Sequence, residues 1–128
     1  MNKQLNPDNV AKPAGTYSHA VEVLAGTRQL FISGQIGVLP DGSAAQGIDA
    51  QAEAVWTNIG NILKAAGMAM TDLVKITILV VNPADIPAVR AVRDRHLAGH
   101  RPASTLMVVA GLASPAYLLE IEAVAARS

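Results

Sequence analysis

Apolar residues recur every three or four positions between Asp49 and Gly67, which predicts a helix with one apolar face. Asp49 is the expected N-cap, and Gly67 is a typical residue at a helix end. A second helix is expected from about residue 84 to residue 98, closed by Gly99. Its inward positions are Ile86, Val89, Val92 and Leu97.

Other segments have the composition of strands. The run "LVKITILVV" (residues 73–81) is nearly continuous and rich in β-branched residues, which predicts a strand buried on both faces. Asn82 and Pro83 end it. Four more strands are expected at residues 20–25, 29–38, 104–109 and 117–126, with turns at Gly26-Thr27 and at residues 40–47 and 111–115.

The predicted order of elements is β-β-α-β-α-β-β within one α+β domain, residues 1–128. Each helix lies between two strands, so each can form a right-handed crossover packed on the sheet. Two helices cover only one face. The other face still carries apolar residues and needs cover, which a sheet-against-sheet oligomer would supply.

The composition supports association. Apolar residues make up 51% of the chain and charged residues 16%, more apolar than an average soluble domain. The longest apolar runs are too short to cross a bilayer, so surplus apolar surface is expected between subunits. The formal net charge is zero and aromatic residues are 3%, which makes nucleic acid an unlikely partner.

The chain has no cysteine, which excludes disulfides and thiolate chemistry. The N-terminal segment has no apolar run after its lysine, so it does not resemble a signal peptide. A cytoplasmic location is the resulting expectation.

Glu120 and Glu122 are the most informative charged residues. They lie two apart in an otherwise apolar strand, so they share one face of the sheet. A carboxylate there is costly unless it is paired or solvated in a cleft. Glu120 could polarise a water as a general base, or could simply line a solvated edge. For Glu122 the solvated edge is the better interpretation.

Histidines and serines give weaker signals. His96 and His100 are four apart, like helical metal ligands, but Gly99 is expected to end the helix between them. Surface histidines are the better interpretation, and no metal site is predicted. Ser33 in "FISGQ" lacks the glycine of a nucleophile elbow, because Phe31 stands there. It is expected to line a pocket or bond locally.

Arg90 and Arg93 are predicted on the polar side of the second helix. Asp94 is four residues after Arg90, so a surface ion pair accounts for part of this cluster. The alternative is a cationic rim for an anionic ligand.

Several motifs together resemble the Rid family, also called YjgF or L-PSP-type proteins. They extend nearly from end to end: "GTYSHAV" (15–21), "FISGQIGV" (31–38), "AQAEAVWTNIGNILKAAG" (50–67), "DLVKITILV" (72–80), "RPAST" (101–105) and "EIEAVAA" (120–126).

The resemblance implies a chorismate-mutase-like fold, a homotrimer with a central barrel of sheets, and ligand clefts between subunits. It also implies hydrolysis of reactive enamines and imines to a 2-keto acid and ammonia, without metal or cofactor. An arginine in a Pro-Ala-Arg-Ser motif would hold the substrate carboxylate. A water held by Glu120 and a backbone carbonyl would attack the imine carbon, and Tyr17 and Ser33 would shape the cleft.

The sequence departs from that motif at its arginine. Residues 102–105 read Pro-Ala-Ser-Thr, so Ser104 stands at the arginine position. Arg101 is three residues earlier, about 10 Å away along extended chain, and an odd offset points it to the opposite face. Three outcomes are open: a less acidic or differently oriented ligand, another arginine such as Arg90 or Arg93 in the cleft, or binding without deamination.

The leading hypothesis is therefore a trimeric small-molecule hydrolase of the imine deaminase type, with altered substrate range. Glu120 would position water, Ser104 and Thr105 would contact substrate, and Tyr17 and Ser33 would line the cleft. One alternative is a metabolite-binding or regulatory module without catalysis. A ribonuclease or translation inhibitor is the least favoured alternative.

Overall fold

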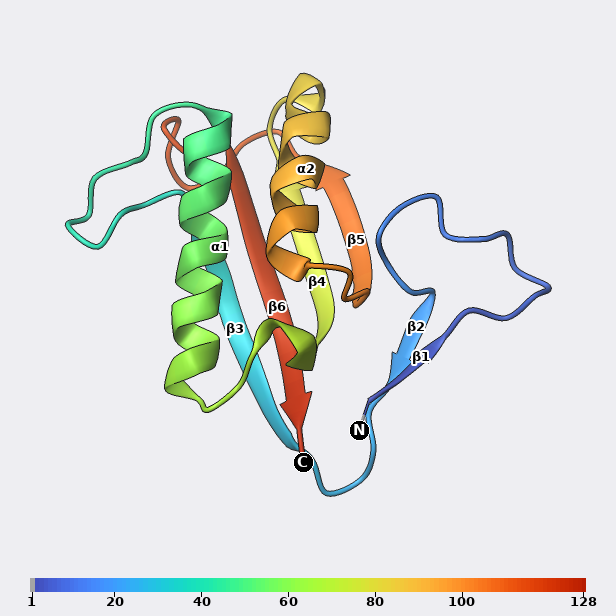
Figure 1. Cartoon of the computed structure of the whole chain (residues 1–128). Coiled ribbons are helices and arrows are strands. Elements are labelled where there is room, and N and C mark those ends of the chain that lie inside the picture. The colour runs from blue at the N-terminus through green and yellow to red at the C-terminus, as the bar shows by residue number, and fades with distance from the viewer. Residues whose placement is uncertain (1) are drawn as a thin grey trace.

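The central sheet has four strands in the order β3 (Arg28–Ile36), β6 (Leu119–Arg127), β4 (Leu73–Val80) and β5 (Ala103–Val108) (Figure 1). A computed structural model describes residues 2–128. β6 is antiparallel to both β3 and β4, while β4 and β5 are parallel. The C-terminal strand therefore lies inside the sheet, between the strands on either side of the first helix.

The helices α1 (Ile48–Ala65) and α2 (Ile86–Leu97) lie on the same face of this sheet (Figure 1). Short 3-10 turns at Met70–Asp72 and Pro83–Asp85 follow α1 and precede α2. The predicted α+β order is confirmed, with α1 joining β3 to β4 and α2 joining β4 to β5. In residues 2–128, no helix is long and apolar enough to cross a membrane.

The N-terminal segment forms a separate ribbon. β1 (Lys3–Leu5), which the sequence did not predict, pairs antiparallel with β2 (Ala20–Glu22). The predicted strand at 20–25 is thus shorter than expected and lies outside the four-stranded sheet. Most of its side chains are exposed, so little burial is available to extend it.

Glycines in positive-φ conformations, rather than side-chain caps, mark both ends of α1. The helix begins at Ile48 with Gly47 as N-cap, so the prediction of Asp49 as the cap is wrong. Asp49 instead lies in the first turn, where its charge favours the helix dipole. The predicted end is confirmed: Gly67 has φ +70°, and its N–H donates to the Lys64 carbonyl at 3.0 Å.

The core lies between the helices and the sheet. On β4, the side chains of Ile76, Ile78 and Val80 are fully buried, while those of Lys75, Thr77 and Leu79 are only partly buried. The prediction that β4 is buried on both faces is therefore wrong for a single chain. Two helices cover one face, and the opposite face, called the open face below, has no cover from this chain. Other fully buried core residues are Trp56, Ile59, Leu63, Leu119 and Ile121.

A carboxylate joins the two helices at their outer surface. Glu53 of α1 accepts hydrogen bonds from His96, at 2.8 Å, and from Arg95, both on α2. The His96 ring also stacks on Trp56, with ring centroids 6.1 Å apart. The hydrogen bond from His96, and next that from Arg95, lower the pKa of Glu53 below its ordinary value.

This pair of contacts predicts an acid-sensitive helix contact. A carboxylate whose pKa is lowered in the folded state contributes stability above its ordinary pKa and loses it as the pH falls through the folded value. We expect Glu53→Gln to lower the unfolding temperature at pH 7, and the difference from wild type to shrink below about pH 4.5. Thermal unfolding followed by circular dichroism from pH 3 to pH 8 measures this. A difference that stays constant with pH would contradict it.

Candidate functional site

Glu120 and Glu122 lie on the open face, as their spacing predicts. Their neighbours on β6, Leu119, Ile121 and Ala123, are buried under the helices. Across the sheet, Glu120 is opposite Leu79 of β4, and Glu122 is opposite Thr77. Both carboxylates therefore project from an apolar strand toward the side without helices.

A bulge in β3 positions the Glu120 carboxylate. Ile32 pairs with Ala123 and Gln35 with Ile121, so three steps along β3 match two steps along β6. A Cβ atom at Gly34 would lie 1.8 Å from Glu120 Oε2 and 2.7 Å from its carboxyl carbon. The Glu120 side chain thus lies directly on the backbone of Gly34. Only a glycine leaves room for the carboxylate in this position.

Ser33, beside Gly34, lines a concavity of about 360 Å³ on the same face. Lys75 also lines it, and its Nζ donates to Thr105 Oγ1 at 2.6 Å. The other lining residues are Phe31, Ile32, Thr77, Glu122, Ala123 and Val124. Glu120, Ser33 and Thr105 of the predicted site thus share the open face, but only Ser33 of the three lines this concavity, and the glutamate that lines it is Glu122.

Lys75 is a residue that the sequence analysis missed. It is the one charge in an otherwise apolar run, which is the same signal that singled out Glu120. Applying that criterion to "LVKITILVV" would have placed a cation on the face of the glutamates.

Tyr17 and Ser104 lie elsewhere, at the edge of the sheet. Ser18 forms a parallel bridge with Ala103: its N–H donates to the Pro102 carbonyl at 3.1 Å and its Oγ to the Arg101 carbonyl at 2.5 Å. These bonds fix the Tyr17 loop against the start of β5. Ser104 is in register with Ile76, so it points to the helix-covered side rather than to the open face.

The predicted residues consequently form two groups in one chain. Glu120, Ser33 and Thr105 belong to the open face. Tyr17 and Ser104 belong to the edge and to the helix-covered side. The sheet separates the two groups, so one chain does not enclose a site that uses both.

Of the three arginines considered, Arg101 and Arg90 are exposed, and Arg93 is buried. Arg101 is exposed, its Nη1 donates to the Gly15 carbonyl at 3.4 Å, and it lines a separate concavity of about 350 Å³ in the N-terminal loop. Its guanidinium is thus bonded to the loop that contains Tyr17. Arg90 is exposed on α2.

Arg93 is not on the polar side of α2. It is only 5% exposed, and its ion pair is with Asp94 rather than between Arg90 and Asp94. Position 93 is one turn after Val89 and one turn before Leu97, at the border of the buried stripe. A long arginine stem can be buried there along apolar neighbours, which the sequence analysis overlooked.

The histidines have structural roles. His96 bonds to Glu53, and His100, beyond the end of α2, bonds through Nε2 to the Leu73 carbonyl at 2.7 Å. Within residues 2–128, no three His, Cys, Asp or Glu side chains lie close enough together to hold a metal ion.

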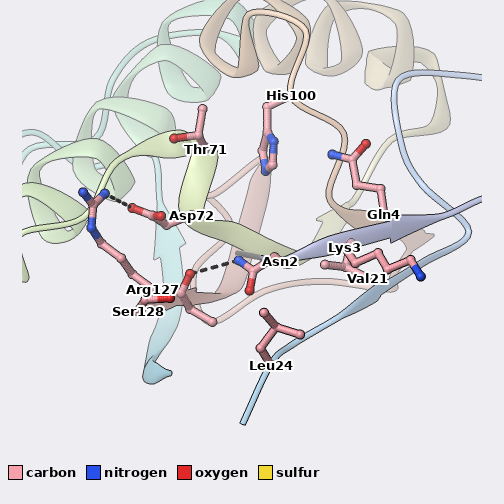
Figure 2. A pocket seen from close by; sticks show the side chains of 11 residues that line it. Asn2, Lys3, Gln4, Val21, Leu24, Thr71, Asp72, His100, Arg127 and Ser128 are labelled. Atoms are coloured by element: carbon pink, nitrogen blue, oxygen red, sulfur yellow. Dashed lines mark hydrogen bonds and ion pairs between the residues drawn. The ribbon is translucent and has the colours of Figure 1, made fainter. Parts of the chain in front are cut away.

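A larger concavity, of about 1040 Å³, lies between the N-terminal ribbon and the C-terminal end of β6 (Figure 2). None of the predicted site residues lines it. Two of its polar groups bond within the lining: Arg127 Nη1 donates to Asp72 Oδ2 at 3.1 Å, and Asn2 Nδ2 to the Ala126 carbonyl at 2.9 Å, while Asn2 Oδ1 is buried without a partner. We therefore place the candidate site on the two groups described above, despite the smaller concavity there.

Comparisons with known proteins agree on one family. Residues 8–127 match the family model described as Endoribonuclease L-PSP. The chain is 34% identical over 125 residues to 2-iminobutanoate/2-iminopropanoate deaminase of Rattus norvegicus, covering 96% of this chain and 88% of the rat protein.

Solved structures show the same fold. YyfB of Yersinia pestis, described as a Rid-family protein, has a TM-score of 0.88 and 35% identity, with 97% of each chain covered. E. coli TdcF with bound serine has a TM-score of 0.74 and 29% identity, covering 98% of this chain and 99% of that chain.

The contact between Gly34 and Glu120 gives a stability test. Gly34→Ala should destabilise the wild-type chain, because the new Cβ collides with the Glu120 side chain. In a Glu120→Ala background the three nearest atoms of that collision are gone. We expect a coupling of about 1 kcal/mol in the double-mutant cycle, measured by urea unfolding. Equal effects of Gly34→Ala in both backgrounds would show that the two residues are not in contact.

Proposed function

Because the chain belongs to the Rid family of L-PSP-type proteins, we propose that it hydrolyses small imines or enamines of 2-amino acids in clefts between subunits. The products are a 2-keto acid and ammonia. The observation that carries the proposal is the Glu120 carboxylate, held over the Gly34 bulge on a face that no helix covers. A carboxylate held in this way is available to a ligand and to water.

Two relatives support the ligand class. The rat protein, 34% identical, is named for two imino acids, 2-iminobutanoate and 2-iminopropanoate. TdcF, 29% identical, was solved with serine, which is also a small compound with a carboxylate next to a carbon that bears nitrogen. A three- or four-carbon imino acid is the substrate class we propose.

A second copy of the chain would complete the site. The open face is apolar around its charges, and Phe31 is 74% exposed on it. A contact in which the β5 edge of one chain lies against the open face of the next would bury Phe31 and would bring Glu120 of one chain toward the Tyr17 and Ser104 edge of its neighbour. A closed ring of three such contacts gives a homotrimer with three identical clefts.

The proposed chemistry needs one proton acceptor. Glu120 accepts a proton from water as the water oxygen bonds to the imine carbon, and that proton then passes to nitrogen. The hydroxyl group of this carbinolamine then gives its remaining proton to Glu120, which passes it to nitrogen as well. The carbon–nitrogen bond breaks, ammonia leaves, and the carbonyl of the keto acid forms. Ser33 and Tyr17 line the cleft, and Ser104 and Thr105 contact the substrate through hydroxyl groups.

A binding module without catalysis is the second candidate, and Ser104 favours it. A neutral hydroxyl holds a carboxylate less strongly than an arginine fork would. A chain with this role would be stabilised by small carboxylates and would not accelerate imine hydrolysis.

Activity is tested with 2-iminobutanoate generated in situ by an amino-acid oxidase. We expect wild type to accelerate keto-acid and ammonia release over the uncatalysed rate. Glu120→Gln should lower kcat/KM at least about 100-fold, because it removes the proton acceptor. Asp49→Asn, which changes an exposed carboxylate on α1 outside the candidate site, should retain most of the activity. Stabilisation by keto acids without any acceleration would support the binding module instead.

The shared cleft is tested by mixing two inactive variants. Glu120→Gln removes the carboxylate of the open-face group, and Ser104→Trp blocks the group at the edge of the sheet. If each site takes one group from each of two chains, trimers assembled randomly from equal amounts should recover about a quarter of the activity.

Light scattering on each sample gives the assembly mass, expected at three chains. A site within one chain would leave the mixture inactive. A monomeric mass would contradict both the trimer and the shared cleft.

A further inference from the structure

The buried guanidinium of Arg93 has fewer partners than it has donors. Of its five N–H groups, only that on Nε donates to a described residue, Asp94 Oδ1 at 2.9 Å. The Asp94 side chain is itself 46% exposed, so this ion pair is partly screened by water. The remaining N–H groups of this guanidinium, which is 5% exposed, have no acceptor among residues 2–128 and depend on water or a ligand for their hydrogen bonds.

The unpaired end of Arg93 points toward the Tyr17 loop. Arg93 Nη2 is 3.9 Å from the position of a Cβ on Gly15, and Tyr17 Cδ1 is at the same distance from that point. Arg93 Nη2 and Tyr17 Cδ1 therefore lie no farther apart than twice that distance. The two Nη atoms of Arg93 are not completely buried, so this end of the side chain remains accessible to water.

Arg93 and Ser104 belong to the same side of the sheet. The Tyr17 loop is bonded to Pro102 and Arg101, immediately before Ser104. Ser104 points toward the side on which α2 packs, and Arg93 is on the buried stripe of α2.

We propose that Arg93, extending from α2, holds the ligand carboxylate that the strand motif, with Ser104, no longer holds. The inference rests on the proposed cleft and specifies its ligand: a small 2-imino or 2-oxo acid whose planar carboxylate accepts two parallel bonds from the guanidinium. The cation enters from the helix instead of the strand. The carboxylate is therefore bound on the side of the cleft that Tyr17 and Ser104 form.

Binding of 2-oxobutanoate, the keto-acid product, tests this without turnover. Isothermal titration of the full-length protein should show Arg93→Met weakening its affinity at least about tenfold, because charge-assisted bonds are lost. Butanone has the same carbon chain and no carboxylate, so its weaker binding should not change. Met keeps much of the apolar stem, which limits damage to packing.

A second variant separates ligand binding from a structural role. Arg93→Met combined with Ser104→Arg returns a guanidinium to the strand and should recover at least half of the lost binding energy, whereas a purely structural defect would remain. Arg95→Met, an exposed arginine on the same helix, is the control and should bind as wild type does.

Each outcome decides a different point. If Arg93→Met binds 2-oxobutanoate as wild type does, or if Arg90→Met causes the loss instead, the role of Arg93 is overturned. If wild type binds and Arg93→Met does not, Arg93 holds the carboxylate even where no imine hydrolysis is found, and only the proposed activity fails. If wild type shows no binding of 2-oxobutanoate at millimolar concentration, the carboxylate site is overturned whatever the hydrolysis rate.

Discussion

Two helices can cover only one face of a four-stranded sheet, and the rest of the structure depends on that limit. The covered face contains the fully buried side chains of α1, β4 and β6. The open face contains Glu120, Glu122, Lys75 and the exposed Phe31. Charged groups stay solvated there beside exposed apolar side chains such as Phe31. In the function we propose, the same face would provide both the chemistry and a surface for association.

The position of Glu120 depends on a residue with no side chain. Any residue other than glycine at position 34 would place its Cβ on the Glu120 side chain. The β3 bulge and Gly34 together leave space for the carboxylate. The close approach restricts where the carboxylate can go, as a reacting group requires. In the Ser-Gly-Gln motif, Gly34 thus leaves room for the Glu120 carboxylate, and Ser33 lines the concavity of the open face.

Arg93 and Arg101 differ in burial, and this difference cannot be read from their positions in the sequence. Arg101 stands next to the motif in the chain; it is exposed and bonds to the Gly15 carbonyl, in the same loop that Arg93 approaches. Arg93 is eleven positions before Ser104, yet it is buried and directed at the Tyr17 loop. A guanidinium reaches far from its backbone, so proximity in sequence says little about which one meets a ligand. In the role we propose for Arg93, the helix that covers the sheet supplies the cation that Ser104 does not.

The sequence by itself determined the order of the elements, the two-residue spacing that places Glu120 and Glu122 on one face, and the family resemblance, because these depend on local periodicity and motif. It also singled out Ser104, since a difference from the Pro-Ala-Arg-Ser motif can be read directly from the order of the residues. It did not locate the cap of α1 at Gly47, the pairing of β1 with β2, the role of Lys75 or the burial of Arg93. Only the tertiary structure decided those, and it separated the site residues onto two sides of the sheet. Such features depend on register, on a bulge and on which face the helices occupy, and these are contacts between segments far apart in the chain.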